Sequence, residues 1–304
     1  MATTESSESA RSLAIQSVIY LNDLTELQRA AAAACISAAA AKAAGVIGAW
    51  TYVLGDGSPK PLLGTEDIEH FASVAANAGG SFAYTFFGAN LGHGGGHNRL
   101  ALQGESDLLL FLNPDGILGP QAVSDLATAV SGDVGAADAR QLPIEHAKEF
   151  DAVTGDTSWA SGACLMTQSH VFSLAEGFDS ETFFLYGDDV DYSWRVKLVG
   201  YRVVHCPSAR LFHDKRLTVS SDWPATEAEL RYSAEAALFL AHKFSRQDVL
   251  SSLLSTFTSR GDAHSLAAIE TFETRRRAGE LVSPIDPEHR IGQFVNGNYA
   301  IHRY

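Results

Sequence analysis

The chain has 304 residues, of which 46% are hydrophobic and 19% are charged, a composition typical of a globular protein with a sizeable core. Its 22 Lys and Arg residues against 36 Asp and Glu residues give a net charge of −14. This charge argues against nucleic acid and anionic lipid as general partners, because both bind through cationic side chains. Three cysteines without a C-x-x-C spacing favour a reducing compartment over a disulfide framework or a zinc ribbon.

Residues 1–12 predict a flexible tail, because this stretch is rich in Ser, Thr and Glu and lacks the basic start of a secretory signal. The longest stretch of low polarity, Ala30 to Ala41, falls short of the roughly 20 apolar residues that a membrane span needs. We therefore expect a cytoplasmic protein without a transmembrane segment, and contact with the inner face of a membrane stays open.

Strands and helices alternate in the N-terminal half. Ser17 to Leu21 predicts a short buried strand, and an alanine-rich helix follows to about Ala44, where Gly45 ends it. Val46 to Leu54 predicts a second strand, which the turn formers from Gly55 to Pro59 close. This order is the βαβ pattern of a parallel sheet.

Two further strands are predicted at Ser81 to Phe87 and at Leu108 to Leu112. The first leads into a glycine-rich loop, Asn90 to Asn98, and the second into Asn113 to Gly116, a sequence typical of a β-turn. In open α/β sheets, ligands bind at the carboxyl ends of the parallel strands. These polar loops are therefore where we expect the chemistry.

Later strands are predicted at Ala160 to Thr167 and at Tyr201 to Cys206, where Pro207 closes the second. Arg210 to His213 follows it, and a helix is expected from near Asp188 to Gly200.

The last third of the chain differs from the rest. Glu227 to Phe257 and Ala263 to Leu281 have helical periodicity without strand alternation. We divide the chain into a tail at 1–12, an α/β catalytic domain at 13–218 and a C-terminal helical region at 219–304. These helices are expected to pack on the α/β domain, and pairing of two protomers or contact with a membrane surface stay open as other roles.

The glycine-rich loop does not match the common phosphate-binding signatures. A G-x-G-x-x-G motif that starts at Gly92 would need a glycine at His97, and the chain has no G-K-S/T sequence. His93 and His97 have the spacing of a helical zinc pair, but the three glycines between them argue against a helix. We expect a loop whose bare backbone approaches a phosphate or a sugar.

Three carboxylates, Asp188, Asp189 and Asp191, stand together at the start of a predicted helix. The helix dipole and capping explain one or two of them, and Asp191 is spaced to pair with Arg195 one turn later. Such crowding of negative charge costs stability unless a cation or the role of a base balances it. Asp188 and Asp189 are therefore the candidates for chemistry.

Asp115 directly follows a buried strand and offers an oxygen ligand to a divalent cation that also holds a substrate diphosphate. His213 follows the last strand and is a candidate to complete such a site. The alternatives are an ordinary β-turn at Asp115 and a structural histidine at His213.

Taken in order, these motifs resemble those of the family 2 inverting glycosyltransferases of the GT-A fold, and most of all their bacterial rhamnosyltransferase-like branch. The resemblance runs over about two thirds of the chain, from Ser17 to His213. The stretches that carry it are Asp56 to Ser58, Asn90 to Asn98, Leu112 to Asp115, Ser161 to Cys164, Gly177 to Asp179, Phe183 to Arg195 and Gly200 to Val204. It implies a GT-A α/β fold with a mostly parallel central sheet flanked by helices, followed by the C-terminal helical region.

The resemblance implies transfer of a sugar from a nucleotide donor, dTDP-L-rhamnose or otherwise a UDP-sugar, to a hydroxyl of a glycan or lipid-linked acceptor. It makes Asp189 the general base, with Asp188 as its catalytic neighbour, and makes Asp115 and His213 the ligands of Mg²⁺ or Mn²⁺ on the diphosphate. The residues expected to contact the nucleotide sugar are Asn22, Asp56, Asn90, Gly92, Gly96, Asn98, Asn113 and Arg195. Lys215 and Arg216 are alternatives to Arg195 in assisting departure of the diphosphate.

Two positions depart from the family pattern. Asp188 stands where the family usually has glutamate, and Asn113 begins the metal motif in place of an aspartate. A first alternative function is a non-catalytic nucleotide- or carbohydrate-binding module on the same fold, which binding without turnover would favour. A second is a nucleotidyltransferase, which needs a glycine-rich basic loop where this chain has Asn22 to Leu24.

Overall fold

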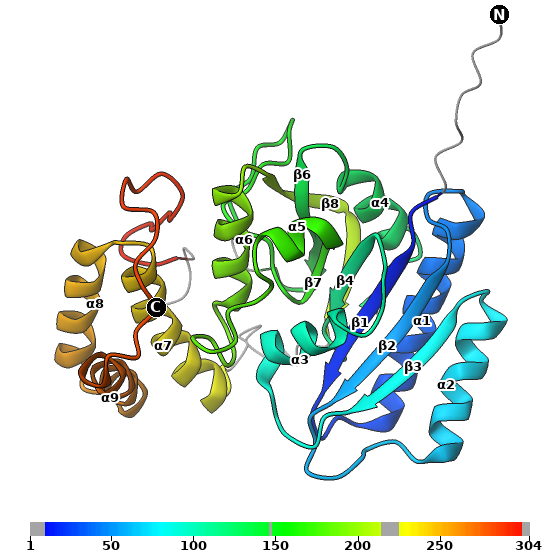
Figure 1. The fold of residues 1–304 in the computed structure, drawn as a ribbon, viewed down its shortest axis with the longest axis horizontal. Helices are drawn as coiled ribbons and strands as arrows, with labels where there is room; N and C mark the ends of the chain where they lie inside the picture. The colour runs from blue at the N-terminus through cyan, green and yellow to red at the C-terminus, as the bar shows by residue number, and fades with distance from the viewer. Residues whose placement is uncertain (1–9, 146–147, 214–224, 300–304) are drawn as a thin grey trace, which may run out of the picture.

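The computed structural model describes residues 10–145, 148–213 and 225–299 (Figure 1). The described strands are β1 Leu13–Ile19, β2 Trp50–Asp56, β3 Ser81–Phe86, β4 Leu108–Leu112, β5 Gly116–Leu118, β6 Val134–Leu142, β7 Cys164–Gln168 and β8 Arg202–His213. The described helices are α1 Leu24–Ala43, α2 Thr65–Asn77, α3 Gly92–Ala101, α4 Ala122–Ala129, α5 Ser169–Leu174, α6 Asp188–Leu198, α7 Glu227–Lys243, α8 Gln247–Arg260 and α9 Ala263–Ala278.

The eight strands form one sheet in the order β3-β2-β1-β4-β7-β6-β8-β5. Strands β1 to β4 are mutually parallel where they pair, whereas β7 runs antiparallel to both of its neighbours, β4 and β6. Strand β8 is parallel to β6, and β5 is antiparallel to β8. The expected α/β sheet flanked by helices is confirmed, and the sheet is mixed, because β7 and β5 run antiparallel to the strands they pair with.

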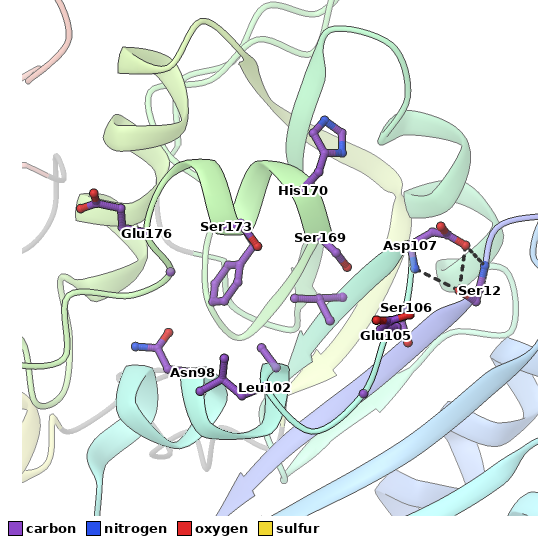
Figure 2. Close-up of a pocket in the computed structure, with 15 residues that line it drawn as sticks. Ser12, Asn98, Leu102, Glu105, Ser106, Asp107, Ser169, His170, Ser173 and Glu176 are labelled. Carbon is purple, nitrogen blue, oxygen red and sulfur yellow. Dashed lines mark hydrogen bonds between the residues drawn. The ribbon is translucent and has the colours of Figure 1, made fainter.

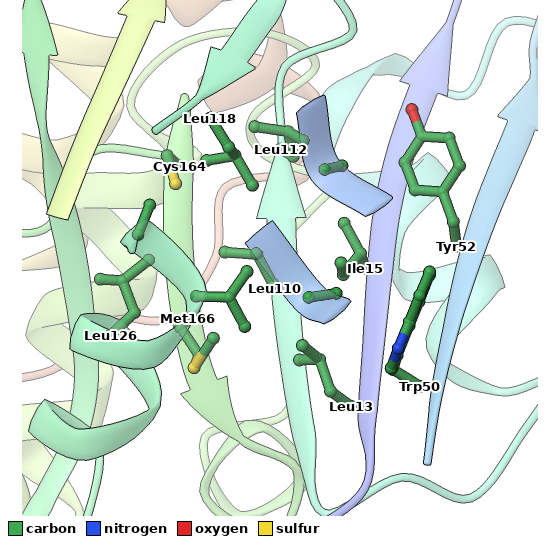
Figure 3. Packing of buried hydrophobic residues seen from close by; sticks show 14 of the residues in the cluster. Leu13, Ile15, Trp50, Tyr52, Leu110, Leu112, Leu118, Leu126, Cys164 and Met166 are labelled. Atoms are coloured by element: carbon green, nitrogen blue, oxygen red, sulfur yellow. The ribbon is translucent and has the colours of Figure 1, made fainter. Parts of the chain in front are cut away.

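Strand β4 shows why the centre of the sheet has an uninterrupted apolar sequence. Leu108, Leu110 and Leu112 belong to a core with β1, β2, α1 and α4, while Leu109 and Phe111 face a second core with α5 and α6. Figure 3 shows the first core, with leucines of β4 next to side chains of β1, β7 and α4. A strand buried on both faces needs no polar alternation.

The alanine-rich helix α1 begins one residue after Asp23, whose carboxylate caps it by accepting hydrogen bonds from the backbone N–H groups of Thr25 (2.9 Å) and Glu26 (3.1 Å). One side of the helix is buried in the first core. The small side chains on that side allow the helix to pack closely, so α1 covers one face of β1, β2 and β4.

The C-terminal helices pack on the α/β part through α6. Trp194 and Val190 of α6 share an apolar cluster with buried residues of α7, α8 and α9. Lys243 of α7 adds ion pairs, with Nζ at 2.7 Å from Asp179 Oδ2 and 2.6 Å from Asp191 Oδ1. The expected packing of these helices is thus confirmed, and Figure 1 shows them beyond α6, at the opposite end of the molecule from α2.

Several predicted boundaries need correction. The helix expected over Glu227 to Phe257 is two helices, α7 and α8, because the chain turns at Ser245, which has a φ of 60°. Pro207 does not close a strand: β8 continues to His213, and the register with β6 shifts from the pair Ala139–Cys206 to Arg140–Arg210. This irregularity leaves the proline out of the ladder, where its missing N–H costs nothing.

The sequence prediction placed nothing at α2, α4 and β6. The boundary drawn between 218 and 219, and the candidates Lys215 and Arg216, lie outside the described residues.

Candidate active site

A cavity of about 320 Å³ lies where β4 ends and β7 begins. Because β7 is antiparallel to β4, Leu112 pairs with Cys164, and the stretch just before β7 lies at the carboxyl end of β4. The cavity is lined by five residues that the sequence predicted for catalysis or ligand binding: Asn113, Asp115, Asp188, Asp189 and His213. His93, Gln141, Gly162, Tyr186 and, from α7, Ala228 also line it.

The register of a three-residue strand brings Asp115 and His213 together. Gly116 of β5 pairs with His213 at the end of β8, so the preceding residue lies beside the imidazole. His213 Nε2 is 3.2 Å from Asp115 Oδ2 and 3.4 Å from Asn113 Nδ2. On the other side of the ring, Nδ1 is 3.3 Å from Gln141 Oε1. Gln141 is buried, and its amide nitrogen donates to Ser161 Oγ at 2.9 Å, which directs its oxygen towards the histidine.

Asp188 and Asp189 begin α6 and point into different surroundings. Asp189 Oδ2 accepts a hydrogen bond from the backbone N–H of Gly162 at 2.9 Å, and its Oδ1 accepts from the N–H of Val190 at 2.8 Å. Asp188 is buried, and its Oδ2 is 2.6 Å from His93 Nδ1. Both residues lie in the first turn of α6, where the helix dipole favours negative charge.

Arg195 does not line the cavity. Its Nε is 2.8 Å from Asp191 Oδ2, as the spacing predicted, and its guanidinium also donates to the carbonyl oxygens of Ala175 and Gly177. The arginine therefore holds the turn before α6. Its expected contact with the donor stays a prediction that these bonds do not favour.

The glycine-rich segment is a helix, α3, and the expectation of a loop was wrong. The low helix propensity of glycine is outweighed here by packing, because a larger side chain would not fit on the buried face of α3. A Cβ at Gly92 would lie 2.2 Å from the carbonyl oxygen of Phe184, and one at Gly96 would lie 2.7 Å from Val18 Cγ1. Gly92 also has a φ of 70°, which favours glycine.

Asn98, one of the predicted donor contacts, instead clamps α3 to the turn at Phe178. Its Nδ2 donates to the Phe178 carbonyl at 2.7 Å, and its Oδ1 accepts from the Phe178 N–H at 2.9 Å. Asn22 and Asn90 hold turns in the same way: Asn22 Oδ1 accepts from the N–H of Tyr20 and Asn90 Oδ1 from that of Gly92. Their contacts with a nucleotide stay predictions.

Asp56 is fully buried at the end of β2 and organises the turn after it. Its carboxylate accepts hydrogen bonds from the backbone N–H groups of Ser58 (2.8 Å) and Leu62 (2.7 Å) and from the hydroxyl of Tyr84 (2.5 Å). Burial opposes the charged form, but these hydrogen bonds outweigh it and lower the pKa of Asp56 below its ordinary 3.8. Any effect of Asp56 on a nucleoside would therefore be indirect, through the backbone of the turn that its carboxylate holds.

We expect Asp56→Asn to lower the free energy of unfolding by about 1–3 kcal/mol, because an amide nitrogen would face buried donors. The folded pKa is lowered, so the stabilisation is present above the ordinary carboxyl pKa and is lost as the pH falls through the folded value. Urea unfolding of both proteins should therefore show a difference at pH 7 that shrinks in acid. Equal midpoints at pH 7 would contradict this role.

A larger cavity, of about 720 Å³, lies at the amino ends of β1 and β4 (Figure 2). Ser12 and Asp107, which precede β1 and β4, line it together with residues around α5. Asp107 there accepts two hydrogen bonds from Ser12, each at 2.7 Å. Of the predicted site residues only Asn98 reaches it, so size does not identify the active site here.

Sequence reasoning missed two residues of the smaller cavity, His93 and Gln141. His93 was considered only as half of a zinc pair, and recognising α3 as a helix would have placed it on the buried side. Gln141 carries no signal in the sequence, because its importance comes from the position of β6 beside β8. The described residues contain no group of three or more His, Cys, Asp or Glu side chains placed to hold a metal ion.

No protein-family model matches the chain. A curated N-acetylglucosaminyl-diphospho-decaprenol L-rhamnosyltransferase from Mycobacterium tuberculosis is 29% identical over 206 residues, which cover 52% of this chain and 66% of the relative. The match thus spans slightly less than two thirds of that relative's length. The sequence resemblance to a rhamnosyltransferase is confirmed.

Solved structures show the same fold. A mannosyltransferase from Pyrobaculum calidifontis, in complex with GDP-Man and Mn²⁺, matches with a TM-score of 0.54 and 12% identity over 88% of this chain and 82% of that chain. GalNAc-T7 with UDP, GalNAc and Mn²⁺ matches with a TM-score of 0.61 and 11% identity over 91% of this chain and 55% of that chain. The chain therefore has the GT-A fold. Among the described residues, no helix has the length and apolar character to cross a membrane.

Proposed function

We propose that this chain, a GT-A-fold protein related to the family 2 rhamnosyltransferases, transfers a sugar from a nucleotide donor to a hydroxyl of a glycan or lipid-linked acceptor with inversion. The donor is dTDP-L-rhamnose or otherwise a UDP-sugar, and the name of the mycobacterial relative, an L-rhamnosyltransferase, supports rhamnose as the sugar. The observation that carries the proposal is the meeting of Asp115, His213 and Asp189 in one cavity at the carboxyl end of β4. Homodimerisation and contact with a membrane surface stay predictions.

The pair of Asp115 and His213 fits a divalent cation. Gln141 Oε1 faces Nδ1 of the imidazole, so Nε2 is the ring nitrogen that faces Asp115 and would coordinate a cation. Nε2 lies 3.2 Å from Asp115 Oδ2, so an imidazole nitrogen and a carboxylate oxygen, both common ligands of divalent cations, stand next to each other. One carboxylate and one imidazole leave coordination positions for diphosphate oxygens, as Mg²⁺ and Mn²⁺ sites in nucleotide enzymes require.

When bound, the cation supplies positive charge that offsets the negative charge developing on the departing diphosphate. Asp189, which lines the same cavity, accepts the proton of the acceptor hydroxyl as that oxygen forms a bond to the anomeric carbon. The bond from the anomeric carbon to the diphosphate breaks in the same displacement, and the nucleoside diphosphate leaves. Gly162 N–H fixes Asp189 Oδ2, so the carboxylate is oriented before the acceptor arrives.

A transfer assay tests the proposal. The protein is incubated with Mn²⁺, a polyprenyl-diphosphate-linked GlcNAc acceptor, and dTDP-L-rhamnose or one of several UDP-sugars, and product formation is followed by mass spectrometry. We expect one donor to yield an acceptor heavier by a single sugar residue, and EDTA to suppress the product. Nucleotide binding without turnover across a wide acceptor panel would instead favour the non-catalytic binding module.

A further inference from the structure

His93 joins the two carboxylates at the start of α6. Its Nδ1 is 2.6 Å from Asp188 Oδ2, and its ring lies against Gly162, where an added Cβ would meet Cε1 at 3.0 Å and Nε2 at 3.5 Å. The N–H of Gly162 in turn donates to Asp189 Oδ2 at 2.9 Å. His93 therefore contacts Asp188 directly and reaches Asp189 through one residue, Gly162.

We propose that His93 is a positioning residue of the active site, which as an imidazolium pairs with Asp188 and holds Gly162 in place against Asp189. This inference rests on the proposed function, because it takes Asp189 as the base. His93 touches neither the sugar nor the acceptor in this role. It acts by fixing the direction and the charge of the two carboxylates.

The charges around His93 support the protonated form. Asp188 and Asp189 face it from α6, and the backbone of Gly162 faces it from the segment before β7. Burial disfavours the charged ring, but the charge and hydrogen bond of Asp188, the charge of Asp189 and the hydrogen bond to Gly162 raise the pKa of His93 above 6.5. On its own helix, His97 is buried and stays neutral, because burial and then the charge of His93 lower its pKa well below 6.5.

The negative charge of Asp188 affects Asp189, its neighbour in the sequence. Asp188 is only 3% exposed, and two adjacent carboxylates without a cation would raise the proton affinity of one of them. A general base has to be ionised before the acceptor binds. The positive charge of His93 beside Asp188 reduces the repulsion between the two carboxylates.

The glycines of α3 allow this close approach. A Cβ at Gly94 would lie 2.7 Å from Phe178 Cβ and 3.2 Å from Asp188 Oδ2. The backbone N–H of His93 also donates to the carbonyl oxygen of Phe184 at 3.2 Å. The bare helix surface therefore brings His93 within reach of a carboxylate that stands 95 positions later in the chain.

The proposal predicts a pH dependence with a defined sign. The pKa of His93 is raised. The ring is therefore fully protonated below the ordinary histidine pKa, and its positive charge is lost as the pH rises through the raised value. We expect kcat of the wild-type enzyme to fall on this alkaline side.

His93→Asn and His93→Leu test this prediction. Asparagine keeps an N–H near the position of Nδ1 but carries no charge, whereas leucine removes the hydrogen bond. We expect kcat to fall by about tenfold in His93→Asn, without the alkaline limb, and by about a hundredfold in His93→Leu, with the donor KM nearly unchanged in both. His170→Asn, an exposed histidine on α5, is the matched control and should keep the wild-type profile.

A merely structural His93 would give a loss independent of pH and no advantage of asparagine over leucine, and either result would overturn the proposal. Histidine NMR adds a readout that needs no turnover, with the His93 signals assigned by their loss in His93→Asn. We expect His93 to titrate at a higher pH in the wild type than in Asp188→Asn. Equal titration in both proteins would refute the ion pair, whereas failure of the transfer assay alone would refute only the proposed function.

Discussion

Asp189→Asn is expected to reduce kcat for sugar transfer by roughly 100- to 10,000-fold, the range that a positioned general base contributes. The amide keeps the size of the side chain and accepts from Gly162 through its oxygen, but it has no negative charge with which to take the hydroxyl proton. Affinity for the nucleotide should change little, because Asp189 lies on the acceptor side of the proposed displacement. Rates with saturating donor, together with calorimetric binding of the donor nucleotide, measure the two effects separately.

Asp133→Asn is a suitable control for Asp189→Asn, because the Asp133 side chain is 70% exposed and lies outside the cavity. It should leave transfer unchanged. If Asp189→Asn transferred sugar at the wild-type rate, Asp189 would not be the base. Loss of both transfer and nucleotide binding, with a lowered melting temperature, would show that the variant is damaged as a whole.

Asp115→Ala and His213→Ala are expected to weaken binding of Mn²⁺ in the presence of dTDP or UDP by more than the roughly 10- to 100-fold that loss of an outer partner costs. Each change removes one of the two proposed protein ligands, whose Oδ2 and Nε2 atoms are 3.2 Å apart. The fraction of free Mn²⁺, followed by electron paramagnetic resonance, reports the affinity directly. It does not require an acceptor.

Gln141→Leu distinguishes a direct metal ligand from a residue that only orients the ligand His213. It removes the acceptor for His213 Nδ1 but leaves Asp115 and the imidazole in place, so its effect on Mn²⁺ affinity should be smaller than that of His213→Ala. Metal binding by Asp115→Ala and His213→Ala that equals the wild type would mean that the diphosphate and its cation are held elsewhere.

The sequence predicted structure best where the residues of a single helix or strand determine that element. Strand β4 was predicted with its observed ends, because five consecutive buried apolar residues stop at a turn sequence. The helix at Asp188 was predicted from its acidic first turn, and the carboxylates do begin α6. Asp189 and Asp115 therefore reached the same cavity, as the order of the motifs implied.

Prediction failed where distant parts of the chain decide the structure. The low propensity of glycine argued against a helix at Gly92, but the backbone there packs on Val18, Phe178 and Phe184, which no local pattern shows. The contact of Asp115 with His213 depends on β5, a strand of three residues that carries almost no signal of its own. The role proposed for His93 likewise depends on Asp188, which lies on another helix, α6.

Binding of dTDP, UDP and GDP, each measured by calorimetry with Mn²⁺, Mg²⁺ or EDTA, tests the central claim most directly, because it needs no knowledge of the acceptor. A cavity that holds a nucleotide sugar through Asp115 and His213 should bind one of these nucleotides with a metal and lose it with EDTA. The same result identifies the donor class. Absence of binding for all three nucleotides with either metal would contradict the assignment of this cavity as the active site of a glycosyltransferase.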